Sequence, residues 1–363
     1  MDYKVEECVK QSVYSDLYEI AVSGADFGKL KNAAVLITGA GGFIGYYLAA
    51  SLLLRNDLYG DNITVLALVR NEQKARAKFG KLTERPDFKL CVQDVTEEIR
   101  APRADFIIHA ASQASNIQFE TDPVGTINAN LSGTANVLEY AKKSQAEATL
   151  IVSSLKVYGT VYGSQEKLRE EDSGYLDFTS YKNCYAMGKR ASETLAASFC
   201  REYGMHIKIA RPAYIYGAAS LEDDRVWAQF IANVVRRQNI LLKSNGAARR
   251  SFCYVTDTAS ALLYILLSGE DATPYNISCE ASDVTIRGFA RAACEAFPDR
   301  QLTLSFANPA DEKEPEELQT PLRQVPELLD NQKLRALGWQ PKVDLTEGIR
   351  RSVAVLEEKN DLI

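Results

Sequence analysis

Short runs of apolar residues alternate along the chain with longer stretches in which apolar residues recur at helical spacing. The run AVLIT ends in glycines and is followed by FIGYYLAASLLLR, which suits a buried helix, so this unit is predicted as strand, tight turn and helix. Further apolar runs of strand length follow, and their alternation with helical stretches predicts a parallel sheet covered on both faces. The predicted strands are residues 34–38, 63–69, 89–92, 106–109, 149–153 and 207–211.

The pattern changes after residue 212 to mixed helices, loops and short strands. We therefore expect an α/β protein, a Rossmann doubly wound parallel sheet with a smaller C-terminal mixed α/β lobe that binds substrate. The expected parts are an N-terminal helical extension (1–31), a dinucleotide-binding domain (32–212, with returning segments at about 249–268) and a mainly substrate-binding lobe (213–363).

Composition and charge narrow the function. With 363 residues, 46% hydrophobic and 25% charged, the chain has globular composition. Its net charge of −6 comes without a long basic block, so we expect no nucleic-acid partner. Two histidines and seven cysteines without a CxxC pair predict no metal site. The first ten residues lack an apolar signal core and no apolar run could cross a bilayer, so we expect a cytoplasmic protein with no membrane segment.

Gly39, Gly42 and Gly45 lie in TGAGGFIG, between the first predicted strand and its helix. Glycines permit the tight turn and let a diphosphate approach backbone N–H groups at the positive end of the helix. Because a strand precedes them and a helix follows, we predict a dinucleotide site.

The second predicted strand ends in Val69, Arg70 and Asn71, without the carboxylate that commonly holds the adenosine ribose of NAD. Arg70 is able to stack on adenine or to neutralise a 2′-phosphate, so NADP stays open beside NAD. A solvated charge at the strand end is the third option. Asp94, at the end of the third strand, is placed to accept from the adenine amino group or to form a turn.

Tyr185 and Lys189 are four residues apart in a predicted helix, so their side chains share one face. A phenol has an ordinary pKa of about 10, and both an ammonium and an oxidised nicotinamide ring favour its phenolate. Ser154, after an earlier predicted strand, offers a hydroxyl to the same substrate oxygen. We predict that these three residues are catalytic, with Tyr185 as the general base.

With these residues the chain resembles the extended short-chain dehydrogenase/reductases, the NAD-dependent epimerase/dehydratase family of nucleotide-sugar enzymes. The motifs that carry the resemblance are TGAGGFIG, FIIHAAS, NLSGT, SSLKVYG, YAMGK, ARPAYIYG, RRSFCYVTD, YNIS and LGWQP, spread over residues 35–353. The phrases NCYAMGKRASET, DDRVWAQFI and RRSFCYVTD look closest to the UDP-glucuronate decarboxylase branch.

The resemblance implies a tightly bound NAD or NADP, a nucleotide-diphosphate sugar as partner and a homodimer built on the helix that carries Tyr185. It places Ser154, Tyr185 and Lys189 at the family's catalytic positions, with Lys189 also holding the cofactor ribose. It implies that His109 is structural with a cofactor contact. The further cofactor-binding residues that it implies are Phe43, Ile44, Val95, Ala110, Ala111 and Pro212.

Some of the candidate substrate residues differ from those that the family carries at the same positions. Leu155 and Lys156 stand where dehydratases carry Asp and Glu, and decarboxylases carry a Glu at the second of these positions. Lys156 is able to hold a sugar carboxylate or to act as an acid, or else it points away from the site. Tyr214 replaces an Asn that many relatives carry.

Three arginines complete the candidate substrate site. Arg250 matches an arginine that contacts substrate in the decarboxylases, and Arg211 and Arg225 are candidates for the nucleotide end. A planar guanidinium suits a diphosphate because it donates two bonds at once. The alternative for each arginine is a surface charge or a structural ion pair.

We therefore expect a nicotinamide-dependent enzyme that oxidises a nucleotide-linked sugar to a transient keto sugar. Because the acidic positions are lost, epimerisation is the least demanding outcome and is our first prediction. Decarboxylation of the UDP-glucuronate type is the alternative, followed by 4,6-dehydration or keto-sugar reduction. A cofactor-binding sensor without turnover is the non-enzymatic alternative.

Overall fold

A seven-stranded parallel sheet forms the centre of the computed structural model, which describes residues 3–313 and 323–358. The strand order is β11-β7-β5-β4-β1-β2-β3, so the chain begins in the middle of the sheet and winds outward in both directions. The strands are β1 (Ala34–Thr38), β2 (Thr64–Val69), β3 (Phe88–Val92), β4 (Phe106–His109), β5 (Ala148–Val152), β7 (Ile207–Pro212) and β11 (Pro274–Ile277). The predicted doubly wound Rossmann fold is confirmed, and the six predicted strands are found with ends that differ by at most one residue.

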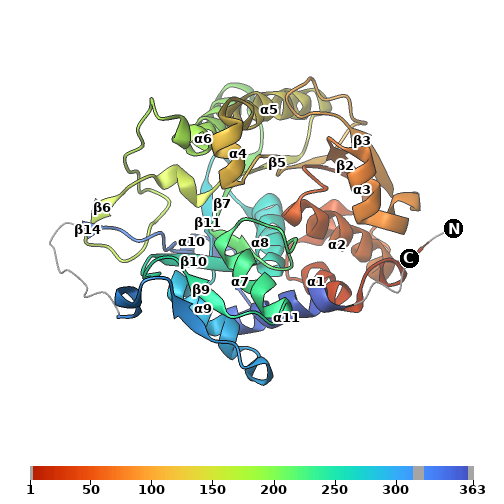
Figure 1. Ribbon diagram of the computed structural model, residues 1–363. Coiled ribbons are helices and arrows are strands. Elements are labelled where there is room, and N and C mark those ends of the chain that lie inside the picture. Colours follow the sequence, from red (N-terminus) through yellow and green to blue (C-terminus); the bar gives the residue numbers. More distant parts are fainter. Residues whose placement is uncertain (1–2, 314–322, 359–363) are drawn as a thin grey trace.

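Helices cover both faces of this sheet. α5 and α6 pack on each other and on the central strands from one side, and α2 and α8 do so from the other (Figure 1). α3 follows β2, and the short α4 precedes α5. Their bounds are α2 (Phe43–Tyr59), α3 (Glu72–Phe79), α4 (Asn116–Thr121), α5 (Pro123–Ser144), α6 (Cys184–Tyr203) and α8 (Val255–Ser268).

The rest of the described chain builds smaller sheets beside the large one. β8 (Tyr214–Tyr216), β10 (Arg249–Tyr254) and β12 (Asp283–Thr285) form a three-stranded sheet. The two-stranded sheets are β9 (Ile240–Leu242) with β13 (Leu304–Phe306), and β6 (Tyr162–Gly163) with β14 (Arg323–Gln324). The helices here are α7 (Val226–Val235), α9 (Ile286–Glu295), α10 (Gln332–Arg335) and α11 (Leu345–Glu357). The predicted boundaries at residues 31 and 212 stay predictions, and β11 and α8 belong to the large sheet and its cover although they follow residue 212.

β11 is the strand of the large sheet that the apolar pattern did not predict. It is four residues long, begins with a proline and carries Asn276, which is fully buried. The Asn276 side chain is satisfied there, because it accepts from the Tyr158 hydroxyl at 2.6 Å and donates to the Leu168 carbonyl at 3.1 Å. A buried polar residue with tertiary partners leaves no apolar signal in the sequence.

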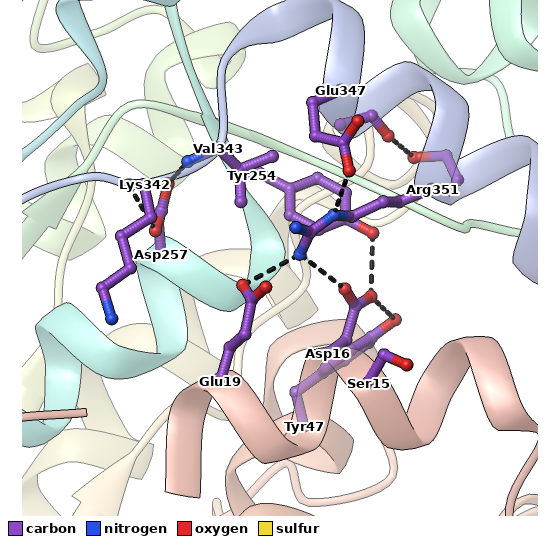
Figure 2. Close-up of polar contacts among 12 residues, drawn as sticks. Ser15, Asp16, Glu19, Tyr47, Tyr254, Asp257, Lys342, Val343, Glu347 and Arg351 are labelled. Atoms are coloured by element: carbon purple, nitrogen blue, oxygen red, sulfur yellow. Dashed lines mark hydrogen bonds and ion pairs between the residues drawn. The ribbon is translucent and has the colours of Figure 1, made fainter. Parts of the chain in front are cut away.

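The two ends of the described chain meet under the sheet. α1 (Gln11–Ala21) packs against α2, α8 and α11. Figure 2 shows the polar cluster at this junction, where the Asp16 carboxylate accepts from the Tyr254 hydroxyl at 2.8 Å and lies 3.4 Å from the Arg351 guanidinium. Arg351 also pairs with Glu19 of α1 at 2.8 Å. The cluster therefore links α1 to the last residue of β10 and to α11.

In the part of the chain that the structure describes, no helix is both long enough and apolar enough to cross a membrane.

Candidate active site

Glycines stand in the turn between β1 and α2, and in the first turn of α2, at positions where a larger residue does not fit. Gly39 has a φ of +69°, and a Cβ on it would lie 2.8 Å from the Ala111 Cα. A Cβ on Gly45 would collide with the Gly39 carbonyl oxygen. The Gly42 N–H donates to that carbonyl at 2.8 Å, and α2 begins at the next residue. The backbone therefore wraps round the N-terminus of α2, whose free N–H groups favour an anion.

A pocket lies beside this turn, at the carboxyl ends of β1, β2 and β4. The predicted cofactor residues that line it together are Gly39, Gly42, Arg70, Asp94, Val95, Ala110 and Ala111. Those that lie outside its lining are Phe43, Ile44, Gly45, Tyr185, Lys189 and Pro212. The pocket is also lined by residues that the sequence analysis did not select: Gly41, Leu68, Val69, Asn71, Lys74, Ala75, Ser112, Gln113 and Ala129.

Two of these lining residues, Asn71 and Lys74, could have been found from a helix-start signal in the sequence. Asn71 is the N-cap of α3 and accepts from the Lys74 N–H at 2.8 Å, a spacing typical of the start of a helix. Lys74 then lies on the first turn of α3, near the end of the same strand as Arg70. The small and apolar lining residues are recognisable only once the strand ends are brought together.

Ser154, Tyr185 and Lys189 meet at the carboxyl end of β5. Ser154 directly follows the strand region and caps a 3-10 turn, accepting from the Lys156 N–H at 3.2 Å. The Tyr185 phenol is hydrogen-bonded to the Ser154 hydroxyl. Lys189, one helical turn from Tyr185 on α6, donates to the Val152 carbonyl at 2.7 Å and lies 5.7 Å from the centre of the Tyr185 ring.

Burial shifts the pKa of each group at this centre. It raises the pKa of Tyr185, and the Ser154 hydrogen bond and the charge of Lys156 act in the opposite direction. It lowers the pKa of Lys189, a side chain only 3% exposed, to about 8. It also lowers the pKa of His109 to about 3, with a further contribution from the charge of Lys189. His109 is therefore neutral near pH 7, and the acid and base chemistry passes to Tyr185.

His109 is the last residue of β4 and pairs with Thr38 at the end of β1. Its Nδ1 lies 2.8 Å from the Thr38 hydroxyl, which accepts from the Ala111 N–H at 3.1 Å. Its Nε2 is buried and has no hydrogen-bond partner among the described residues. A buried ring nitrogen without a partner suits a polar atom of a ligand in this place.

Phe119 is a neighbour of Tyr185 that the sequence analysis missed. It lies on α4, and its ring stacks on the Tyr185 ring with the centroids 5.0 Å apart and the planes 23° apart. The Tyr181 hydroxyl, just before α6, donates to the Glu120 carboxylate at 2.8 Å and ties the two segments together. No spacing in the sequence indicates this contact, because it forms only when α4 folds back over the start of α6.

Lys156, Tyr214 and Arg250 converge on one carboxylate, that of Glu327. The Lys156 Nζ donates to Glu327 Oε1 and to the Tyr214 hydroxyl, both at 2.8 Å. The Tyr214 hydroxyl and the Arg250 Nε lie 2.7 and 2.9 Å from Glu327 Oε2. Glu327 is itself held by its backbone, because its carbonyl accepts from the Ser251 N–H at 3.0 Å. Three candidate substrate residues are thus brought together by a fourth that the sequence analysis missed.

The charges in this cluster stabilise one another. Burial opposes the charged form of Glu327, but Lys156 and Arg250 outweigh it and lower the pKa of the carboxyl. Burial likewise opposes the charged form of Lys156, but Tyr214 and Glu327 outweigh it and raise the pKa of the ammonium. Lys156 therefore remains a cation, and 40% of its side chain is exposed.

Arg211 and Arg225 lie in ion pairs of their own. Arg211 donates twice to the Glu193 carboxylate, at 2.9 and 2.7 Å, and once to the Glu170 carbonyl at 2.8 Å. Arg225 pairs with Asp223 at 2.7 Å and lies over the Trp227 ring, 4.6 Å from its centre. These are the structural ion pairs that we gave as the alternative, and substrate contact by either arginine stays a prediction.

The residues present fit a nicotinamide dinucleotide. The glycine turn brings N–H groups to a diphosphate, and His109, whose Nε2 has no partner among the described residues, directly precedes Ala110 and Ala111 of the pocket lining. The Tyr185 and Lys189 pair stands at the carboxyl end of the same sheet. Within residues 3–313 and 323–358, no three His, Cys, Asp or Glu side chains are grouped to hold a metal ion.

Fold and site together define a Rossmann-fold dinucleotide protein with a Ser, Tyr and Lys centre. Residues 35–278 match the NAD dependent epimerase/dehydratase family. The chain is 31% identical over 320 residues to UDP-glucuronic acid decarboxylase 6 of Arabidopsis thaliana, which covers 88% of this chain and 87% of that protein. The chain therefore belongs to this family and is a nicotinamide-dependent nucleotide-sugar enzyme, which confirms the resemblance seen in the sequence.

Solved structures show the same fold. The UDP-glucose 4-epimerase of Thermus thermophilus, in complex with NAD, is 25% identical with a TM-score of 0.69, covering 89% of this chain and 98% of that one. The dTDP-glucose 4,6-dehydratase DesIV of Streptomyces venezuelae, as a double mutant with NAD bound, is 22% identical with a TM-score of 0.71, covering 90% of this chain and 97% of that one. These likenesses extend over most of the chain, the large sheet and the smaller part alike.

Proposed function

We propose that the protein decarboxylates a nucleotide-linked uronic acid through a transient keto sugar. The observation that carries this proposal is the cluster of Lys156, Tyr214 and Arg250, which already surrounds one carboxylate close to the catalytic centre. The Lys156 N–H donates to the Ser154 hydroxyl at 3.2 Å, so the cluster and the catalytic centre are neighbours. The decarboxylase names of the relatives support the same reaction, and we now favour it over the epimerisation that we predicted first.

The first step needs a base and a hydrogen-bond donor at one sugar oxygen. Tyr185 accepts the hydroxyl proton, and Ser154 donates a hydrogen bond to the oxygen that becomes a ketone. When bound, the nicotinamide ring supplies the acceptor for the hydride of the same carbon and the donor that returns it. Lys189 stabilises the charge of the phenol and orients the centre by its bond to the Val152 carbonyl.

The second step removes the carboxylate. A ketone β to the carboxylate takes up the electron pair of the breaking carbon–carbon bond, so carbon dioxide leaves and an enolate remains, whose oxygen Tyr185 and Ser154 hold. A proton from solvent then adds to the carbon that lost the carboxylate. Atoms and charge balance in this sequence without any added oxidant.

Lys156 and Arg250 are proposed to hold the sugar carboxylate. An ammonium has three donors, and among the described residues Lys156 uses them on Tyr214 and Glu327 only. Two cations and the Glu327 carboxylate leave one positive charge, which one uronate carboxylate neutralises. The raised pKa of Lys156 suits a permanent cation better than a proton donor.

The other reactions have less support. Leu155 is apolar and only 4% exposed, so it offers no proton for water loss in a 4,6-dehydration. Epimerisation or reduction of a neutral sugar would not need the second cation of the cluster. A sensor without turnover would not need Ser154, Tyr185 and Lys189 together.

The test is incubation of the purified protein with UDP-glucuronic acid and UDP-glucose, followed by mass spectrometry and NMR. We expect carbon dioxide and a nucleotide pentose from the uronate and no product from UDP-glucose. An unchanged mass with one inverted hydroxyl would instead identify an epimerase, and loss of water a dehydratase.

Because the hydride returns to the sugar, we propose that the cofactor stays bound between turnovers. Denatured purified protein should then release a nicotinamide dinucleotide that liquid chromatography with mass spectrometry detects. A homodimer through α6 and a cytoplasmic location stay predictions.

A further inference from the structure

Cations line the adenosine end of the dinucleotide pocket. Arg70, at the end of β2, and Lys74, on α3, line the same pocket as Gly39 and Gly41. Lys78 follows one turn later on the same face of α3 and donates to the Gly41 carbonyl at 3.2 Å and to the Gly42 carbonyl at 2.8 Å. One face of α3 is therefore turned toward the glycine turn, and it brings Lys74 to the pocket.

Carboxylates are scarce in the same place. Asp94 is the one acidic residue in the lining of this pocket. Its Oδ1 accepts from both the N–H and the hydroxyl of Thr96, at 2.9 and 2.8 Å, and its Oδ2 lies 3.9 Å from Arg70. Glu72 faces elsewhere and pairs with Arg76 along α3 at 2.8 Å. A ribose 2′-hydroxyl thus finds no carboxylate at the end of β2, where one commonly accepts from it in NAD enzymes.

The two cations have donors to spare. Arg70 has a side chain that is 60% exposed, and among the described residues its one ion pair is the long one to Asp94. In the described part of the chain, no acidic side chain pairs with Lys74. A phosphomonoester carries a charge of about −1.5 to −2 near pH 7, and a guanidinium with an ammonium beside it complements that charge and its oxygens.

We infer that this pocket binds the 2′-phosphate of NADP, with Arg70 and Lys74 as its two ligands. The excess of positive charge carries the inference, since the lining offers two cations and one carboxylate, whose Oδ1 is already bonded to Thr96 and whose Oδ2 faces Arg70. This choice of cofactor sets the chain apart from the neighbours whose structures contain NAD. It concerns dinucleotide binding alone and holds whichever sugar reaction the protein performs.

The first test uses the wild-type full chain, stripped of bound dinucleotide. Isothermal titration calorimetry should give NADP⁺ an affinity at least about tenfold higher than that of NAD⁺, an advantage that shrinks with added salt. Adenosine 2′,5′-bisphosphate should likewise bind more tightly than 5′-AMP, which differs from it only by the 2′-phosphate. Equal affinities, or tighter binding of NAD⁺, would overturn the inference.

Variants then assign the residues. Arg70→Ala and Lys74→Ala should each weaken NADP⁺ binding by about tenfold and leave NAD⁺ binding unchanged. Arg70→Asp should reverse the preference, because it restores an acceptor for the 2′-hydroxyl. Arg76→Ala is the matched control on α3 and should change neither affinity. Equal losses for both dinucleotides in the Ala variants would show that Arg70 and Lys74 do not read the 2′ position. These affinities measure dinucleotide binding alone. If the protein proved not to decarboxylate a uronic acid, the expected affinities would therefore stay the same.

Discussion

At the scale of the residue, the phenol of Tyr185 is controlled by its neighbours. Burial raises its pKa, while Ser154 and the charge of Lys156 act the other way. Lys189 carries a pKa lowered to about 8, so it is still largely protonated at neutral pH. The base therefore depends also on Lys156, which the sequence analysis considered only as a substrate contact or an acid.

Removal of the phenol should separate binding from chemistry. Tyr185→Phe keeps the ring that stacks on Phe119 but loses the hydroxyl. We expect turnover to fall by roughly 10²–10⁴, the usual contribution of a general base, with unchanged dinucleotide content. Product assays and mass spectrometry of the bound dinucleotide check this, and unchanged cellular function of the variant would favour the sensor instead.

Removal of the Lys156 charge should change the pKa of the Tyr185 phenol. In Lys156→Met the pKa of Tyr185 loses a lowering contribution and rises, so the acidic limb of the kcat/KM profile should shift to higher pH. The profile measured between pH 5 and pH 10 checks this. Lys143→Met, an exposed lysine paired with Glu98, is the control. A limb that stays in place or moves to lower pH would contradict the role of Lys156.

At the scale of the element, the link between β1 and α2 has almost no freedom. Its backbone passes so close to the chain after β4 that Gly39 meets both a positive φ and the Ala111 backbone. This closeness is why the first strand, its helix and the pocket were all predictable from one motif. The shape of this turn depends on β1 and α2, which it joins, and on the segment after β4, which it contacts.

Two glycines of this unit allow a matched comparison. Gly39→Ala should cost backbone strain and also displace the Ala111 segment, so we expect a loss of roughly 2–4 kcal/mol in the free energy of unfolding and loss of dinucleotide binding. Gly60, at the end of α2, has a similar φ of +65° with open space round it. Gly60→Ala should cost only about 1 kcal/mol and keep binding intact. Urea unfolding and calorimetry measure both, and equal effects at the two sites would contradict this account.

Other elements depended on contacts far apart in the sequence. β11 is held by the buried Asn276, whose partners are Tyr158 and Leu168. α4 reaches the active site through Phe119, and the loop before α10 does so through Glu327. None of these segments has an apolar period that indicates its place, which is why the sequence analysis did not assign them.

At the scale of the whole molecule, buried carboxylates connect the ends of the chain. Asp16 is 1% exposed and burial raises its pKa to about 6, against the opposing hydrogen bond of Tyr254 and charge of Arg351. Asp257, on α8, is held by the backbone N–H groups of Lys342 and Val343 before α11, and burial raises its pKa to about 6 as well (Figure 2). The packing of α1, α8 and α11 therefore buries two carboxyl groups, and burial makes both of them costly to ionise.

These carboxyls should make stability depend on pH. A carboxyl with a pKa of about 6 when folded and 3.8 as its ordinary value binds more protons in the folded state, so its contribution is complete below pH 4 and is lost as pH rises through about 6. For Asp16 the loss amounts to roughly 3 kcal/mol. Asp16→Asn should therefore lose less stability than the wild type between pH 4.5 and pH 7.5.

Urea unfolding at these two pH values measures the difference. Asp26→Asn, an exposed residue paired with Lys29, is the control and should keep the pH dependence of the wild type. If Asp16→Asn also keeps that dependence, the pKa of Asp16 is not raised by burial and the account of this junction is wrong.

The sequence by itself determined the parts of this protein that depend on local pattern. Apolar runs define strands, glycines define a turn that little else can adopt, and a spacing of four puts Tyr185 and Lys189 on one helical face, so fold, dinucleotide pocket and family could be read directly. Only the tertiary structure decided which distant side chains meet. It placed Glu327 among Lys156, Tyr214 and Arg250, and Phe119 on Tyr185. The reason is physical: such contacts arise when separate segments pack, and their energy depends on burial and on the distance between charges, which no periodicity along the chain encodes.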